Sequence, residues 1–258
     1  MRSRCITRLV TAAVFAMLVI PASALAQRQT ETVDRTLPFP NGGTLELKNF
    51  SGDIRITAGT GRNFVMKAVR RGRAERLKEV ALTVEASGSR IVVDATDRDN
   101  DRDNDRDNQG DNNVVETTFE IQVPADAALN IDAFSSDITV TGIQGALDLH
   151  AFSGDITSTG SRGAVRADTF SGRIDVDATG HGASPALDLE TFSGSMHVRL
   201  SENAKGEIDF NTFSGDLDAA FPVTLKSTGR RHIRAELPAG AGRRLAFESF
   251  SGSLRITR

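Results

Sequence analysis

A Phe-Ser-Gly phrase recurs seven times along this chain of 258 residues, with Ser136 in place of the glycine once. A repeated unit of about 18–22 residues is too short to bury an apolar face of its own, so neighbouring units have to stack on one another. The gap before the last phrase is about twice this period and predicts one degenerate unit between residues 214 and 249. The phrases begin at Phe50, Phe134, Phe152, Phe170, Phe192, Phe213 and Phe250.

Apolar and polar residues alternate on both sides of each motif phenylalanine. Leu45 and Leu47 precede the first one, and Ile54 and Ile56 follow it. This is the period of a strand with one buried face. Apolar residues lie at odd offsets before the phenylalanine and at even offsets after it, so the chain has to turn a corner at the Ser-Gly step, where glycine accepts a positive φ. We expect the seven phenylalanines to fill the inside of this corner, one per unit.

These patterns predict an all-β fold, a β-solenoid of stacked two-strand repeats with a less regular β region at its N-terminal end. The alternative is an antiparallel β-sandwich built from successive hairpins; the fixed corner residues and the stacked apolar positions favour the solenoid. In the less regular region we expect strands near Phe64–Val69, Val80–Ala86 and Ile91–Ala95. Alanine, glutamate, leucine and lysine together predict a short helix around Ala74–Lys78.

The first 26 residues have the composition of a secretory signal peptide. Three arginines precede the apolar run Leu9–Ile20, and the small-residue sequence Ala24-Leu25-Ala26 follows it. The apolar run is shorter than the roughly 20 residues that cross a bilayer, and we expect no transmembrane segment in the mature chain. The sequence therefore predicts a single β-repeat domain over residues 27–258, exported to the periplasm, the cell surface or the medium.

Composition excludes several classes of function. The lone cysteine, Cys5, lies in the predicted signal peptide, so the mature chain has no disulfide framework, no thiolate zinc site and no cysteine nucleophile. The formal charge of −3 argues against nucleic acid as a partner. Tyrosine and tryptophan are absent. With the motif phenylalanines inside the corner, we expect no aromatic sugar-binding platform outside the core unless an off-motif phenylalanine supplies one.

Residues 97–113 repeat Asp, Arg and Asn and contain nothing apolar, so we expect a disordered loop between two strands. Clustered Asp and Asn oxygens are ligands that calcium selects. However, the tract lacks the Gly and Glu positions of an EF-hand loop, and its three arginines repel a cation. We predict a solvated loop, and no cofactor or metal for the protein.

Residues four and two before each motif phenylalanine point outward and are mostly acidic. Such a charged face usually keeps a β protein soluble and discourages sheet-to-sheet association. The alternative is a docking site for a cationic partner or a divalent ion. The candidate binding residues on this face are Asp148, Asp168, Asp188, Glu190 and Asp209.

An enzymatic alternative depends on residues five after the phenylalanine. Asp175, His197 and Asp218 fall on three successive units, and in-register stacking would place the histidine between two carboxylates. This is a candidate acid–base cluster for a carbohydrate-active enzyme, or an ordinary surface ion pair. The sequence has no nucleophile elbow, H-E-x-x-H motif, P-loop or dinucleotide fingerprint. We therefore expect no catalytic residue, and interpret the seven motif serines as corner residues.

Three phrases resemble the S-G-D-I repeat of domain-of-unknown-function family 4097, catalogued as "putative adhesin". The resemblance covers most of residues 40–258 and implies an exported or envelope-associated β-repeat domain with no established activity. The function predicted is a non-enzymatic, adhesin-like interaction module of the cell envelope that binds a protein or glycan; an envelope-stress sensor is an alternative. The phrases are Asn49-Phe50-Ser51-Gly52-Asp53-Ile54, Ala151-Phe152-Ser153-Gly154-Asp155-Ile156 and Thr212-Phe213-Ser214-Gly215-Asp216-Leu217.

Overall fold

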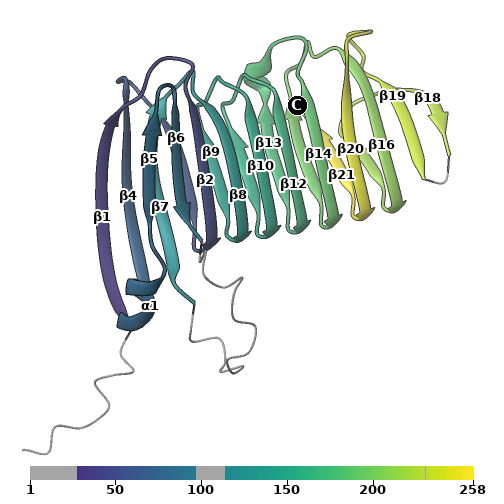
Figure 1. Ribbon diagram of the computed structural model, residues 1–258. Helices are drawn as coiled ribbons and strands as arrows, with labels where there is room; N and C mark the ends of the chain where they lie inside the picture. Colours follow the sequence, from purple (N-terminus) through teal and green to yellow (C-terminus); the bar gives the residue numbers. More distant parts are fainter. Residues whose placement is uncertain (1–27, 97–113, 230) are drawn as a thin grey trace, which may run out of the picture.

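Two long β-sheets, packed face to face, make up nearly all of the protein that the computed structural model describes, which is residues 28–96, 114–229 and 231–258 (Figure 1). One sheet has 10 strands and the other has 11. The predicted signal peptide, residues 1–26, and the predicted loop, residues 97–113, lie outside the described residues. Within the described ranges, no helix has the length and apolar character that a membrane crossing requires.

Each repeated unit contributes one strand to each sheet. The strand that ends in the Phe-Ser step belongs to the 11-stranded sheet, and the strand after the corner belongs to the 10-stranded sheet. The strands before the corner are β2 (Thr44–Ser51), β8 (Ala128–Ser135), β10 (Leu147–Ser153), β12 (Val165–Ser171), β14 (Leu187–Ser193), β16 (Gly206–Ser214) and β20 (Arg243–Ser251). The strands after it are β3 (Ile54–Gly59), β9 (Ile138–Thr141), β11 (Ile156–Thr159), β13 (Ile174–Ala178), β15 (Met196–Leu200), β17 (Leu217–Ala219) and β21 (Leu254–Thr257).

Neighbouring units pair in parallel and in register. Leu147 of β10 lies opposite Val165 of β12, and Ile156 of β11 lies opposite Ile174 of β13. Equivalent residues of successive units therefore form columns that run along the stack. The predicted β-solenoid is confirmed, and the antiparallel sandwich is wrong.

Antiparallel strands and one short helix complete the two ends of the stack. Strand β1 pairs antiparallel with β4, β4 with β7, and β5 with β6, while β18 and β19 form a hairpin beside β16. The predicted short helix and N-terminal strands are present. These elements are β1 (Gln29–Pro38), β4 (Asn63–Gly72), α1 (Ala74–Glu79), β5 (Thr83–Ser87), β6 (Arg90–Ala95), β7 (Glu116–Pro124), β18 (Thr224–Thr228) and β19 (His232–Glu236). A 3-10 helix, η4 (Thr179–His181), follows β13 within the stack.

The last two units do not stack in chain order. Strand β20 lies between β14 and β16, so the unit of Phe250 is inserted between the units of Phe192 and Phe213. The predicted degenerate unit in residues 214–249 is wrong, because the middle of this segment forms the β18–β19 hairpin, which turns back antiparallel on β16. The hairpin covers the end of the sheet where a further parallel unit would otherwise pair.

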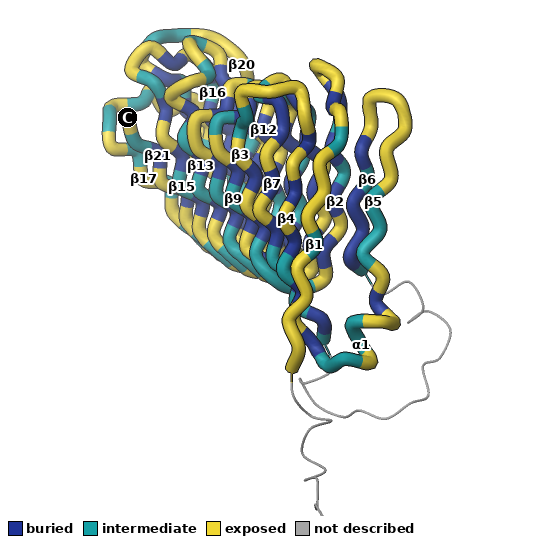
Figure 2. The backbone as a smooth tube through the Cα atoms, turned by 90° about the vertical axis from the view of Figure 1, so that its left-hand side faces the viewer, coloured by how far each residue is buried: buried dark blue, intermediate teal, exposed yellow. Residues whose placement is uncertain are grey.

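The core is one continuous apolar cluster between the two sheets (Figure 2). The alternating residues Leu45, Leu47, Ile54 and Ile56 are all fully buried, as the sequence pattern predicts. Ser158 occupies one core position of the same pattern and is also buried, and its hydroxyl donates a hydrogen bond to Ser161 Oγ at 3.1 Å. The buried hydroxyl at this core position therefore has a hydrogen-bond partner within the protein.

The predicted position of the motif phenylalanines is wrong: they lie outside the corner. Their exposed fractions are 41–51%, whereas the leucines three and five residues earlier in the first unit are buried. The physical reason is strand alternation. Leu45, Leu47 and Asn49 point inward from β2, so Phe50, at the opposite parity on the same strand, points outward. The members of the set are Phe50, Phe134, Phe152, Phe170, Phe192, Phe213 and Phe250.

Close backbone contact explains the glycine of the motif. A Cβ added at Gly154, Gly172 or Gly194 would lie 1.8–2.1 Å from the carbonyl oxygen of the equivalent residue in the preceding unit. A positive φ explains the choice of glycine less well, because Gly52 and Gly154 have a positive φ but Gly172 does not. The corners therefore stack too closely for a side chain at most levels of the column.

We expect Gly172→Ala to lower the free energy of unfolding by about 1–3 kcal/mol, because the new methyl group overlaps the Gly154 carbonyl and the corner has to move. Gly61→Ala is the matched control, since no atom lies within 4 Å of a Cβ at that turn. Urea denaturation followed by circular dichroism measures both. Equal stability of the two variants would contradict backbone packing as the reason for the glycine.

Candidate functional site

The seven motif phenylalanines form one continuous stack of rings on the outer face of the 11-stranded sheet. Neighbouring ring centroids are 4.6–5.0 Å apart and neighbouring ring planes differ by 1–6°. This is the spacing of hydrogen-bonded strands, so in-register pairing produces the stack directly. We call this set the Phe ladder; in stacking order it is Phe50, Phe134, Phe152, Phe170, Phe192, Phe250 and Phe213.

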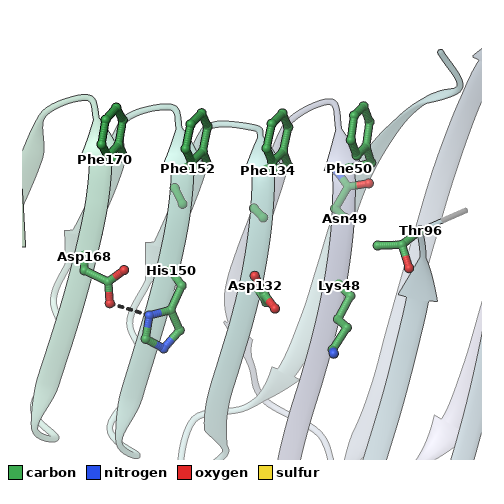
Figure 3. A pocket seen from close by; sticks show the side chains of 12 residues that line it. Lys48, Asn49, Phe50, Thr96, Asp132, Phe134, His150, Phe152, Asp168 and Phe170 are labelled. Atoms are coloured by element: carbon green, nitrogen blue, oxygen red, sulfur yellow. Dashed lines mark hydrogen bonds and ion pairs between the residues drawn. The ribbon is translucent and has the colours of Figure 1, made fainter. Parts of the chain in front are cut away.

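A row of polar side chains runs parallel to the Phe ladder, two residues earlier on each strand. Four of its seven members are carboxylates, and the others are one lysine, one histidine and one asparagine. Figure 3 shows four members of this row below four of the rings. We call it the carboxylate row; in stacking order it is Lys48, Asp132, His150, Asp168, Glu190, Glu248 and Asn211.

Shallow hollows lie between the Phe ladder and the carboxylate row. One, of about 360 Å³, extends from Thr96 to Phe170, and Ala133 and Ala151 contribute to its lining. A second, of about 350 Å³, lies at the other end of the ladder. Large rings on one side and short residues between the rows leave this space open. The site is therefore an elongated surface along the stack rather than an enclosed pocket.

His150 is the titratable centre of the first hollow. Its Nδ1 contacts the carboxylate of Asp168 on the next strand, and its Nε2 lies 3.0 Å from Asp148 Oδ1. The hydrogen bond with Asp168 raises the pKa of His150 above 6.5; burial opposes the rise, and the charges of Asp168, Asp148 and Asp132 add to it. Protonated His150 neutralises part of the carboxylate row.

The structure separates the predicted acidic binding residues into two rows. Asp168 and Glu190 are register neighbours in the carboxylate row. Asp148 and Asp188 lie in the row two residues earlier, where Arg166 stands between them. The binding role of these four residues stays a prediction, but they are not one uninterrupted ladder of carboxylates.

Asp209 is not an exposed surface residue, contrary to the prediction from its position. Its side chain is 1% exposed, because cationic side chains from neighbouring strands cover it. His232 Nε2 lies 2.8 Å from Asp209 Oδ1, and Arg244 Nη2 and Arg234 Nε lie 2.8 and 3.2 Å from its Oδ2. The carboxylate joins the β18–β19 hairpin to the end of the repeats, so it is part of the scaffold.

The predicted alternative cluster is only partly assembled. His197 Nδ1 lies 3.3 Å from Asp175 Oδ2, and its Nε2 lies 3.2 Å from Thr257 Oγ1. Asp218 is not the histidine's other neighbour, because β21 is inserted between β15 and β17 and places Arg255 there. Arg255 Nε donates to Asp218 Oδ2 at 3.0 Å. The predicted arrangement, with His197 between two carboxylates, is therefore wrong.

The described residues offer no grouping of three or more His, Cys, Asp or Glu side chains that could hold a metal ion. The calcium alternative concerned residues 97–113, which lie outside the described part of the chain. Chemically, the surface presents apolar ring edges beside carboxylate side chains. This combination suits binding of a partner that is itself both apolar and charged.

Sequence reasoning placed Asp132 and Glu248 on the outward acidic face without naming them as binding candidates, and it missed the Phe ladder as a surface feature. The signal was present in the sequence. Counting the strand alternation forward from Leu45 and Leu47 places Phe50 on the outer face, at the parity of Glu46 and Lys48. The phase change at the corner begins after the serine, not at the phenylalanine.

Parallel two-strand units, stacked in register into two facing sheets with one motif per corner, define a repeat protein of the β-solenoid class. The chain belongs to the toastrack family DUF4097, which matches residues 25–233. The resemblance carried by the S-G-D-I phrases is thus confirmed. No match is found among curated proteins.

A comparison with solved structures supports this fold. A "putative cell adhesion protein" from Clostridium sporogenes is 14% identical, with a TM-score of 0.52 over 88% of this chain and 99% of its own. A "putative adhesin" from Bacteroides fragilis is 11% identical, with a TM-score of 0.30 over 88% of this chain and 97% of its own. Of these two likenesses, only the first supports the fold.

We expect Asp168→Asn to lower the pKa of His150 toward 6.5, because it removes the hydrogen-bonded carboxylate. Asp188→Asn, two strands from His150, is the control and should leave that pKa unchanged. Histidine NMR titration of the whole protein measures both. An unchanged His150 pKa in Asp168→Asn would contradict the assigned pairing.

The same pair should make stability depend on pH. The raised pKa of His150 contributes stability that is complete below about 6.5 and is lost as the pH rises through the folded-state pKa. Asp168→Asn should therefore destabilise the protein more at about pH 5.5 than at about pH 8.5. Urea denaturation at the two pH values measures the difference, and an effect independent of pH would argue against a charged pair.

Proposed function

We propose that this protein is a non-enzymatic, exported interaction module of the cell envelope, adhesin-like in action, and that the Phe ladder is its binding surface. One observation carries the proposal: seven phenylalanines, each 41–51% exposed, are aligned in a single stack. Stacking alone does not remove these rings from water. A partner that covers the rings would remove their apolar surface from water, and this burial would contribute favourable hydrophobic free energy to binding.

The size of the exposed apolar surface supports binding. Phenylalanine side chains bury about 150–250 Å² each in cores and interfaces, so seven half-exposed rings present several hundred Å² in one strip. Soluble monomers rarely expose a larger contiguous apolar patch, and large patches usually mark interaction sites. Ring stacking also stabilises the fold, by roughly 0.5–1.5 kcal/mol for each ring pair. A purely structural role is therefore the alternative to test.

The carbohydrate-active alternative loses its main support in the structure. Its cluster required His197 between Asp175 and Asp218, and Arg255 occupies one of those places. The remaining pair is a surface contact at 3.3 Å between partly exposed groups. Export follows from the predicted signal peptide and is consistent with an envelope module. Sensing of envelope stress would use the same surface and differs from adhesion only in the signal that binding would trigger.

Replacing two central rings tests the proposal. We expect Phe152→Ser with Phe170→Ser to reduce binding to envelope fragments of the producing cell at least tenfold, because central aromatic residues usually dominate interface energetics. Leu225→Ser is the matched control, since Leu225 is an exposed apolar side chain on β18, outside the ladder. Co-sedimentation of the purified protein with the fragments measures binding, and circular dichroism verifies folding.

Two outcomes would overturn the proposal. If the folded double variant sediments with the fragments as the unaltered protein does, the ladder only stabilises the stack. If the unaltered protein binds no envelope fraction, the module has another location or role. Cell fractionation of the native protein determines which compartment supplies the partner.

A further inference from the structure

We propose that the Phe ladder receives a basic amphipathic helix of another polypeptide, about 19 residues long. This inference deepens the proposed function and rests on the ladder being the binding surface. Three features of the molecule support it: the orientation of the rings, the charge on both sides of them, and the length of the ladder.

The rings present edges rather than faces. Each internal ring is sandwiched between two neighbours at 4.6–5.0 Å, and Arg231 covers the outer face of Phe213 at 4.2 Å from the ring centroid. In the described part of the chain, the ring face left at the other end of the stack is that of Phe50, beside Thr96. Flat sugar rings bind to aromatic faces, whereas Leu, Ile or Phe side chains pack well against a ridge of ring edges. The ladder therefore favours a polypeptide over a glycan.

Acidic residues line both sides of this ridge. The carboxylate row runs on one side, and Glu190 and Glu248 lie next to each other within it. The residues three after each phenylalanine follow the corner on the other side. Four of them are Asp and one is Arg, and Asp53 and Asp155 form ion pairs with Arg55 and Arg173. In stacking order this column is Asp53, Asp137, Asp155, Arg173, Ser195, Ser253 and Asp216. Complementarity requires a partner that is apolar along its centre and cationic on both flanks.

The same charges disfavour two other occupants. A second copy docked ladder to ladder would bring acidic rows against acidic rows, and like charges across an interface oppose association. Anionic lipid headgroups would meet the same repulsion. The acidic rows thus select against self-association and membrane adsorption while they attract basic chains.

A helix satisfies this pattern and a strand does not. Alternate side chains of a strand point to opposite faces, so a strand with its apolar face on the ladder would direct its cations away from the carboxylates. An amphipathic helix carries an apolar stripe with Lys or Arg on both flanks. Seven rings at about 4.8 Å spacing make a ladder about 29 Å long, which a helix of about 19 residues covers at 1.5 Å per residue.

Synthetic peptides test the inference directly. The first probe is a fluorescein-labelled peptide of Leu and Lys with Leu at helical i, i+3, i+4 spacing. The second has the same composition with Leu and Lys alternating, and the third replaces every Lys of the first with Glu. We expect the first to bind the whole protein, the second at least tenfold more weakly, and the third not to bind, as measured by fluorescence anisotropy.

Paired variants separate charge from apolar contact. Glu190→Gln with Glu248→Gln should weaken binding of the first peptide about tenfold and reduce its dependence on salt. The matched control is Glu120→Gln with Glu202→Gln, which removes two exposed carboxylates elsewhere, one of them on the other sheet, and should leave affinity unchanged. Phe152→Ser with Phe170→Ser should abolish binding.

The outcomes distinguish this inference from the proposed function. If envelope binding requires the ladder but the helical peptide does not bind, or the alternating or Glu peptide binds as well, the basic-helix inference is overturned and the proposed function stands. Ladder-dependent binding to phosphatidylglycerol vesicles, or ladder-dependent dimerisation in light scattering, would also overturn it. If the ladder variant leaves envelope binding intact, the proposed function itself fails.

Discussion

Parallel, in-register hydrogen bonding between repeated units is the constraint on which the rest of this structure depends. Every unit has to place its corner within about 4.8 Å of the next. At that distance the backbones of Gly154, Gly172 and Gly194 approach too closely for a Cβ between them. The register that excludes side chains from this column also aligns every other position, so a residue chosen once per unit becomes a column along the whole stack.

Because the units stack in register, a residue type that recurs once per unit forms a continuous row on the surface. One phenylalanine per unit at an outward position produces a ladder of seven rings, and a carboxylate two residues earlier produces an acidic row beside it. Neither surface requires a loop or a separate binding domain. The surface is therefore as rigid as the sheet that carries it, and a partner that fits it loses little free energy to ordering of this protein.

Most of the scaffold could be predicted from the sequence because it depends on local periodicity. Alternation around Leu45, Leu47, Ile54 and Ile56 predicted the paired strands, the corner and the buried columns. The orientation of Phe50 was also available from that alternation, but placing the phase change at the phenylalanine instead of after the serine assigned the ring to the buried positions. The order of the last two units, and with it the neighbours of His197, depends on long-range pairing that no local pattern encodes. The burial of Asp209 depends on cations from β19 and β20, which only the folded chain brings together.

An exposed apolar strip on a sheet surface is a hazard as well as a binding site, because identical strips on two molecules attract each other. In this chain the charge pattern limits that hazard. Each ring of the Phe ladder has an Asp or Glu on at least one of its two sides, and this negative charge makes contact between two copies unfavourable. A neutral border would have left the ladder open to any apolar surface. If the ladder is the binding surface that we propose, its acidic border favours partners that carry positive charge, and the same residues that oppose self-association would then provide selectivity.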